Sequence, residues 1–203
     1  MAKSPLEPPE EVSKAYDEYA KALGHVVNAS NALHETFSRL FWHLSRCPDL
    51  RISNAIWHSH ISDKGQRMML RAALESVPEH KWECRLPKAR KDLDWLITQA
   101  DEYAIKRNDA VHAPCVFQYD ENISEVVASQ RTLNKQARNL ANKRLINVFE
   151  LYASAFGRLN WFTLHAVDAL GNNAVSWPRK PAMPTHDQSH YRGTQHRTAG
   201  NRG

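Results

Sequence analysis

The chain has 203 residues, of which 42% are hydrophobic and 7 are glycine, a composition typical of a globular, helix-rich protein with one sizeable core. Its formal net charge is +5, but from Asn172 onward five basic residues and one acidic residue contribute +4 of this total. Residues 1–171 are therefore nearly neutral, and the charge alone excludes them as a strongly basic, nonspecific nucleic-acid binder.

The cysteines and the first residues indicate a cellular compartment. The three cysteines are odd in number and form no C-x-x-C pair, which argues against a disulfide framework and a cysteine zinc site. The sequence MAKSPLEPPEE lacks the apolar core of a signal peptide, and no later segment has the roughly 18 apolar residues that a membrane helix needs. We therefore expect a cytoplasmic protein with reduced thiols and no contact with a membrane.

The first predicted element is a long helix. It begins after Pro9, and Glu10 and Glu11 suit the positive end of its dipole. Apolar residues then recur at helical spacing as far as Cys47, where Pro48 disfavours further helix. The pattern predicts a helix of about 35 residues, roughly 50 Å long.

Three shorter helices are predicted next, around residues 52–58, 63–76 and 88–112. Ser62 has a side chain suited to capping the second of them. In the third, the apolar residues fall on one face, so this helix is expected to lie against the core.

The pattern changes at residues 115–128, where β-forming residues flank an Asp-Glu-Asn turn and predict a small hairpin. A second long helix is predicted from about Asn134 to Gly171, where Gly and Asn suit a C-cap. Residues 172–203 are rich in Pro, Gly, Ser, Thr and charge, and they predict a disordered basic tail that the fold does not need.

Together these elements predict an all-α fold, an up-and-down bundle of about five helices of which two are long. Residues 1–171 are expected to form the one domain. Within it, residues 1–9 are predicted to be a flexible N-terminus.

The stretch YAIKRNDAVHAPC, residues 103–115, places polar side chains at the end of an apolar helical pattern. Arg107 falls on or beside the apolar stripe, where an unpaired guanidinium is costly to bury unless a partner or ligand meets it. Pro114 disfavours helical geometry at Ala113, so His112 is expected at the helix end. A turn there would bring the imidazole toward the guanidinium, although positions i and i+5 lie roughly 140° apart on a helix.

Arg107-Asn108-Asp109-Ala110-Val111-His112 resembles the R-x4-6-H motif of the HEPN superfamily, including the polar residue that often follows the arginine. The superfamily consists of compact α-helical bundles. Many members are metal-independent endoribonucleases of toxin–antitoxin, phage-defence and RNA-processing systems, and active members pair two motifs across a homodimer cleft. The likeness covers these six residues and a bundle over about residues 10–171, whereas Ala113 and Pro114 replace the small residue, often glycine, expected after the histidine.

The resemblance implies a catalytic role for Arg107, His112 and Asn108. His112 can take the proton of a ribose 2′-OH or return one to the leaving 5′-oxygen, because its ordinary pKa lies near 6.5. Arg107 can stabilise the negative charge that develops at phosphorus, and Asn108 can orient either group or bind phosphate. Lys106 and Asp109 are the candidate substrate-binding residues. The expected products are a 2′,3′-cyclic phosphate and a 5′-hydroxyl, formed without metal or cofactor.

The residues themselves also allow a structural role for Arg107 and His112, and with it a different function. Arg107 can instead pair with Asp109, Asp101 or a carbonyl at the helix end, while His112 caps the helix. The protein would then be a non-catalytic helical interaction or nucleotide-binding module. If the resemblance holds, the expected partners are RNA, a second copy of the chain, and an antitoxin or regulatory protein.

Other polar groups have a simpler interpretation. His58 and His60 have no third metal ligand nearby in the sequence and are expected on a wet surface. Arg131, Lys135 and Arg138 recur at helical spacing and form a basic edge that could follow RNA phosphates, but a solvated face is favoured.

Overall fold

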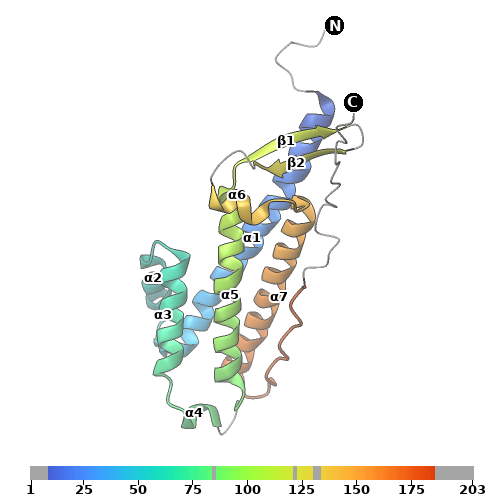
Figure 1. Cartoon of the computed structure of the whole chain (residues 1–203). Helices are drawn as coiled ribbons and strands as arrows, with labels where there is room; N and C mark the ends of the chain where they lie inside the picture. Colours follow the sequence, from blue (N-terminus) through green and yellow to red (C-terminus); the bar gives the residue numbers. More distant parts are fainter. Residues whose placement is uncertain (1–8, 84–85, 121–122, 130–133, 186–203) are drawn as a thin grey trace, which may run out of the picture.

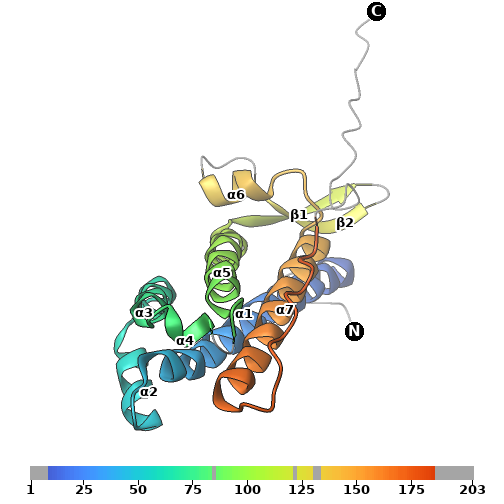
Figure 2. The same cartoon turned by 90° about the horizontal axis from the view of Figure 1, so that it is seen from below.

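The computed structural model describes residues 9–83, 86–120, 123–129 and 134–185. Two long helices, α1 (Glu10–Ser45) and α7 (Leu145–Gly171), lie side by side, and α5 (Ala89–His112) lies against both (Figure 1). On the other side of α5 are α2 (Leu50–Ser59) and α3 (Asp63–Ser76), which also contact α1 (Figure 2). The predicted bundle with two long helices is confirmed.

Helix ends follow local capping chemistry. The Ser62 hydroxyl accepts a hydrogen bond from the Gly65 amide at 3.1 Å, as the sequence predicted for this N-cap. The Asp49 side chain caps α2 by accepting from the Arg51 amide at 2.7 Å. At the end of α1, Arg46 adopts a left-handed conformation with φ of 54°, which turns the chain before Pro48.

The predicted hairpin is also confirmed. Strands β1 (Cys115–Asp120) and β2 (Ile123–Ala128) are antiparallel, and their register pairs Cys115 with Ala128. The Ser129 amide donates to the Pro114 carbonyl at 2.7 Å, which closes the base of the hairpin. Figure 1 shows the hairpin across one end of the bundle, directly after the last turn of α5.

The second long helix differs from its prediction because it is interrupted. Residues 135–140 form a separate short helix, α6 (Lys135–Leu140), and α7 begins only at Leu145. Between them Asn142 has a left-handed backbone with φ of 60°, which an α-helix cannot contain. The break lets α6 pack on α5 while α7 packs on α1. A further short helix, α4 (His80–Glu83), was not predicted.

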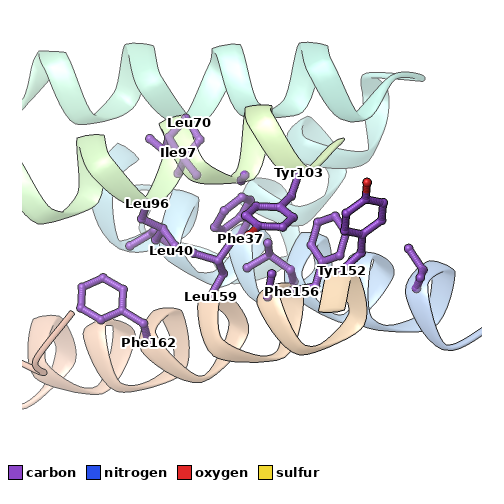
Figure 3. Packing of buried hydrophobic residues seen from close by; sticks show 14 of the residues in the cluster. Phe37, Leu40, Leu70, Leu96, Ile97, Tyr103, Tyr152, Phe156, Leu159 and Phe162 are labelled. Carbon is purple, nitrogen blue, oxygen red and sulfur yellow. The ribbon is translucent and has the colours of Figure 1, made fainter. Parts of the chain in front are cut away.

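The core lies where α1, α5 and α7 meet. Phe37 of α1, Ile97 of α5 and Phe156 of α7 are buried within it, and Tyr103 contacts Phe156 edge-to-face with ring centroids 6.0 Å apart (Figure 3). Phe37 and Ile97 fall on the apolar stripes that the sequence predicts, whereas Phe156 and Tyr103 were not part of the predicted stripes. The core thus fixes the face that α5 turns inward and, with it, the direction of the polar residues near its end.

The first part of the predicted disordered tail instead contacts the bundle. Residues 172–185, here called the strap, run back along α7 toward the hairpin (Figure 1). The Trp177 indole N–H donates to Asp92 at 3.0 Å, and its ring lies edge-to-face to Phe162 with centroids 6.1 Å apart. Met183 also packs against the core. Residues 186–203 of the predicted tail and residues 1–8 of the predicted flexible N-terminus lie outside the described residues.

The strap contacts predict a stability difference between two shortened chains. A chain ending at Gly171 is expected to unfold with a free energy lower by about 2 to 4 kcal/mol than a chain ending at Thr185, because it loses the apolar burial and hydrogen bond of Trp177. Urea denaturation of the two chains measures this difference. Equal free energies would show that the strap does not stabilise the bundle.

Candidate functional site

Arg107 and His112 both lie in the last turns of α5, but on different faces. The helix continues through His112, and the Ala113 amide still donates to the Asp109 carbonyl at 3.0 Å. The expected turn between the two side chains is therefore absent, and no hydrogen bond or ion pair of the described residues joins them. His112 is exposed at the helix end.

Arg107 points toward the N-terminus of α3, where its guanidinium binds the carboxylate of Asp63. Its side chain is 20% exposed, and its Nε is buried and has no hydrogen-bond partner among the described residues. The partner is therefore neither Asp101 nor Asp109, the two carboxylates weighed from the sequence. Asp63 holds the guanidinium in one orientation and leaves part of it accessible.

Three further side chains surround this ion pair. His34 of α1 is 9% exposed, and its Nε2 lies 3.2 Å from Arg67 Nη1 and 3.8 Å from the Asp63 carboxylate. Arg67 is 5% exposed and donates through Nε to Asp101 at 2.6 Å. We call these five residues, from α1, α3 and α5, the Arg107 cluster. No local pattern in the sequence predicts the cluster, because its members come from three helices that are far apart along the chain.

Burial changes the acidity of His34 in this cluster. Loss of solvent around the imidazole lowers its pKa below the ordinary value, the nearby Asp63 carboxylate opposes the shift, and Arg67 reinforces it. His34 is therefore neutral near pH 7. Its Nδ1 is buried without a hydrogen-bond partner among the described residues.

The free energy of unfolding is expected to fall as the pH drops below about 6.5. The pKa of His34 and that of His43 are both lowered by burial, so in this range the unfolded chain binds more protons than the folded chain. Each group contributes at most about 1.4 kcal/mol per pH unit. Urea denaturation between pH 7 and 5.5 measures the slope. In His34→Gln the slope should be smaller, and an unchanged slope would contradict this assignment.

The remaining predicted site residues lie around the end of α5. Asn108 is exposed, and Asp109 accepts a hydrogen bond from Asn139 of α6 at 2.8 Å. The Lys106 ammonium lies 4.0 Å from the centre of the Tyr103 ring, and burial lowers its pKa. Lys143, between α6 and α7, interacts electrostatically with Asp109 and Lys106 and was missed from the sequence. The structure thus brings Lys106, Asp109 and Lys143 together.

The residues considered for metal binding are dispersed in the described part of the chain. His58 and His60 are both exposed near the end of α2. Across the described ranges, no three His, Cys, Asp or Glu side chains gather in a way that would hold a metal ion. None of the helices in these ranges has the length and apolar character that a membrane crossing requires.

Comparison of the chain with protein-family models, with curated proteins and with solved structures finds no match. The resemblance to the HEPN superfamily therefore stays a prediction from the six residues from Arg107 to His112.

Proposed function

We propose that this protein is a HEPN-like, metal-independent endoribonuclease in which Arg107 and His112 act on RNA. The observation that carries the proposal is the placement of the motif at the accessible end of α5. His112 is exposed there, and Arg107 is oriented by Asp63 with its side chain partly exposed. Neither side chain belongs to the apolar core, so the exposed part of each can meet a ligand.

The reaction follows from the chemistry of these groups. The ribose 2′-oxygen attacks phosphorus while a neutral histidine accepts its proton, and the bond from phosphorus to the 5′-oxygen breaks. The protonated histidine returns the proton to the 5′-oxygen, which leaves a 2′,3′-cyclic phosphate and a 5′-hydroxyl. Arg107 stabilises the charge on the phosphoryl oxygens, and Asn108 helps to orient the phosphate. Lys106 binds a neighbouring phosphate, and Asp109 accepts a hydrogen bond from a substrate hydroxyl or base.

A second copy of the chain completes this site in our proposal. Five helical positions separate Arg107 from His112, which places their side chains roughly 140° apart around α5. His112 of one protomer would therefore act with Arg107 of its partner. The apolar side chain of Ile105 is 64% exposed and lies about 20° from His112 around α5, so it suits a contact between copies.

The proposal predicts a homodimer in solution. Light scattering at tens of micromolar should give about twice the 23.3 kDa of one chain. A charged substitution, Ile105→Glu, should shift the mass toward the monomer, while Ile52→Glu on the distant α2 serves as the matched control because Ile52 is similarly exposed, at 54%. A monomeric mass for the unchanged protein would exclude the proposed site shared between two copies.

Cleavage itself is tested by incubating the purified protein with mixed RNA in excess EDTA and identifying the end groups. Cyclic phosphate and 5′-hydroxyl ends support the proposal, whereas uncut RNA or 5′-phosphate ends contradict it. Within this proposal the protein is cytoplasmic and belongs to a toxin–antitoxin or phage-defence system, with an antitoxin or regulatory protein as its partner.

The alternative function is a non-catalytic helical interaction or nucleotide-binding module. It is favoured by one observation, that Arg107 already has a carboxylate partner within its own chain. In that case the ion pair joins α5 to α3 and His112 is a surface residue. Binding of RNA or a partner without cleavage in EDTA would support this module.

A further inference from the structure

A hollow separates the strap from the start of α5, at the opposite end of this helix from Arg107. It has a volume of about 990 Å³, within the range of small-molecule sites. The N-terminal turn of α5 forms one wall and strap residues 173–180 form the other. We call it the strap cavity.

Four cations line the strap cavity and come from two distant parts of the sequence. Lys88 and Lys91 belong to the start of α5, and Arg179 and Lys180 belong to the strap. Asp92 is the one carboxylate among the lining residues. The strap cavity therefore has a clear excess of positive charge.

The Asp92 carboxylate already has two partners within the chain. Asp92 is 9% exposed in its side chain, and its two oxygens accept from Lys180 Nζ and the Trp177 indole N–H, each at 3.0 Å. Lys88, Lys91 and Arg179 make no ion pair within the part of the chain that the structure describes. Three cations thus face one hollow without a protein anion to neutralise them.

This arrangement raises the free energy of the folded chain. Folding places Arg179 in the lining of the same hollow as two lysines that are 88 residues or more away in sequence, and like charges repel. The lysines also lie at the start of α5, where positive charge opposes the helix dipole. An anion in the strap cavity removes both penalties.

We propose that the strap cavity binds a ligand carrying two or more phosphate groups. Lysine and arginine are the side chains that bind phosphate oxygens, and three unpaired cations match more than one phosphate. The site lies 16 residues, or about 24 Å, along α5 from Arg107. The inference is therefore independent of RNA cleavage and adds a second binding function.

The proposal is tested by calorimetric titration of the full chain at low salt, with inorganic pyrophosphate and ATP as separate probes. The double variant Lys91→Gln/Arg179→Gln removes two cations of the strap cavity, and Lys14→Gln/Lys21→Gln removes two exposed cations of α1 as the matched control. Thermal melting checks that all the chains are folded.

We expect the cavity variant to bind either probe at least tenfold more weakly than the unchanged chain, because each lost charge-assisted contact weakens phosphate binding. The control should change affinity by less than threefold. Similar affinity for both probes means that the phosphates alone are bound, and tighter ATP binding means that the strap cavity also holds the nucleoside. Failure of both probes to bind at millimolar concentration, or an equal loss in the control, would overturn the proposal.

Discussion

Replacing Arg107 or His112 with alanine is expected to abolish RNA cleavage and to leave the bundle folded. Loss of the arginine removes a donor to the developing charge and should lower the rate by roughly 10² to 10³. Loss of the histidine removes the general base and should lower it by about 10² to 10⁴. The free energy of unfolding should change by only about 1 kcal/mol, because His112 is exposed and the Arg107 ion pair is partly solvated.

Single-turnover cleavage and urea denaturation together test this expectation. The double variant should be little slower than the slower single variant, because groups acting in one transition state are not additive. Lys106→Ala should raise the KM more than it lowers the kcat. Wild-type cleavage by His112→Ala would exclude the catalytic assignment.

Asp63→Asn provides a control that separates orientation from chemistry. The variant keeps the size of the side chain but removes the charge that holds Arg107. Its cleavage rate should fall less than that of Arg107→Ala. An equal fall would give Asp63 a role beyond holding the guanidinium.

Arg67→Ala is expected to lower the free energy of unfolding by about 3 to 5 kcal/mol. The side chain is 5% exposed and contacts both His34 and Asp101, so its removal leaves a cavity and a buried imidazole without its partner. Arg67→Met should cost less than half as much, because the methionine fills most of the volume. Urea denaturation measures both values. An equal loss in the two variants would show that charge contacts, not packing, make Arg67 important.

Much of the fold can be predicted from local patterns in the sequence. The apolar stripe through Val26, Phe37 and Leu44 predicts α1, and these residues are buried. Ser62 marks the start of α3 because its hydroxyl satisfies an amide three residues later. Such signals act within one or two helical turns, so a single sequence suffices to detect them.

The features that could not be predicted depend on distant contacts or on backbone conformation. The apolar spacing from Leu140 to Val148 predicts one continuous helix, and nothing in that spacing indicates the left-handed turn at Asn142 between them. The packing of Trp177 could not be predicted, because its partners on α5 and α7 are remote from it in sequence.

In the candidate site, too, the local motif could be predicted from the sequence and the contact with a distant residue could not. The motif located Arg107 and His112 at the end of a helix, which is local information. The Asp63 partner comes from another helix 44 residues away, and only the packing of α3 on α5 brings it there.

The strap also fixes the point from which the rest of the chain departs. The Tyr103 hydroxyl donates to the Pro184 carbonyl at 3.5 Å, and the Lys106 ammonium lies over the same tyrosine ring. Pro184 is therefore held within two helical turns of Arg107, whereas Trp177 contacts Asp92 in the first turn of the same helix. The strap thus contacts α5 near its start and again toward its end, so detachment of the strap would expose the packed surface of α5 at both places.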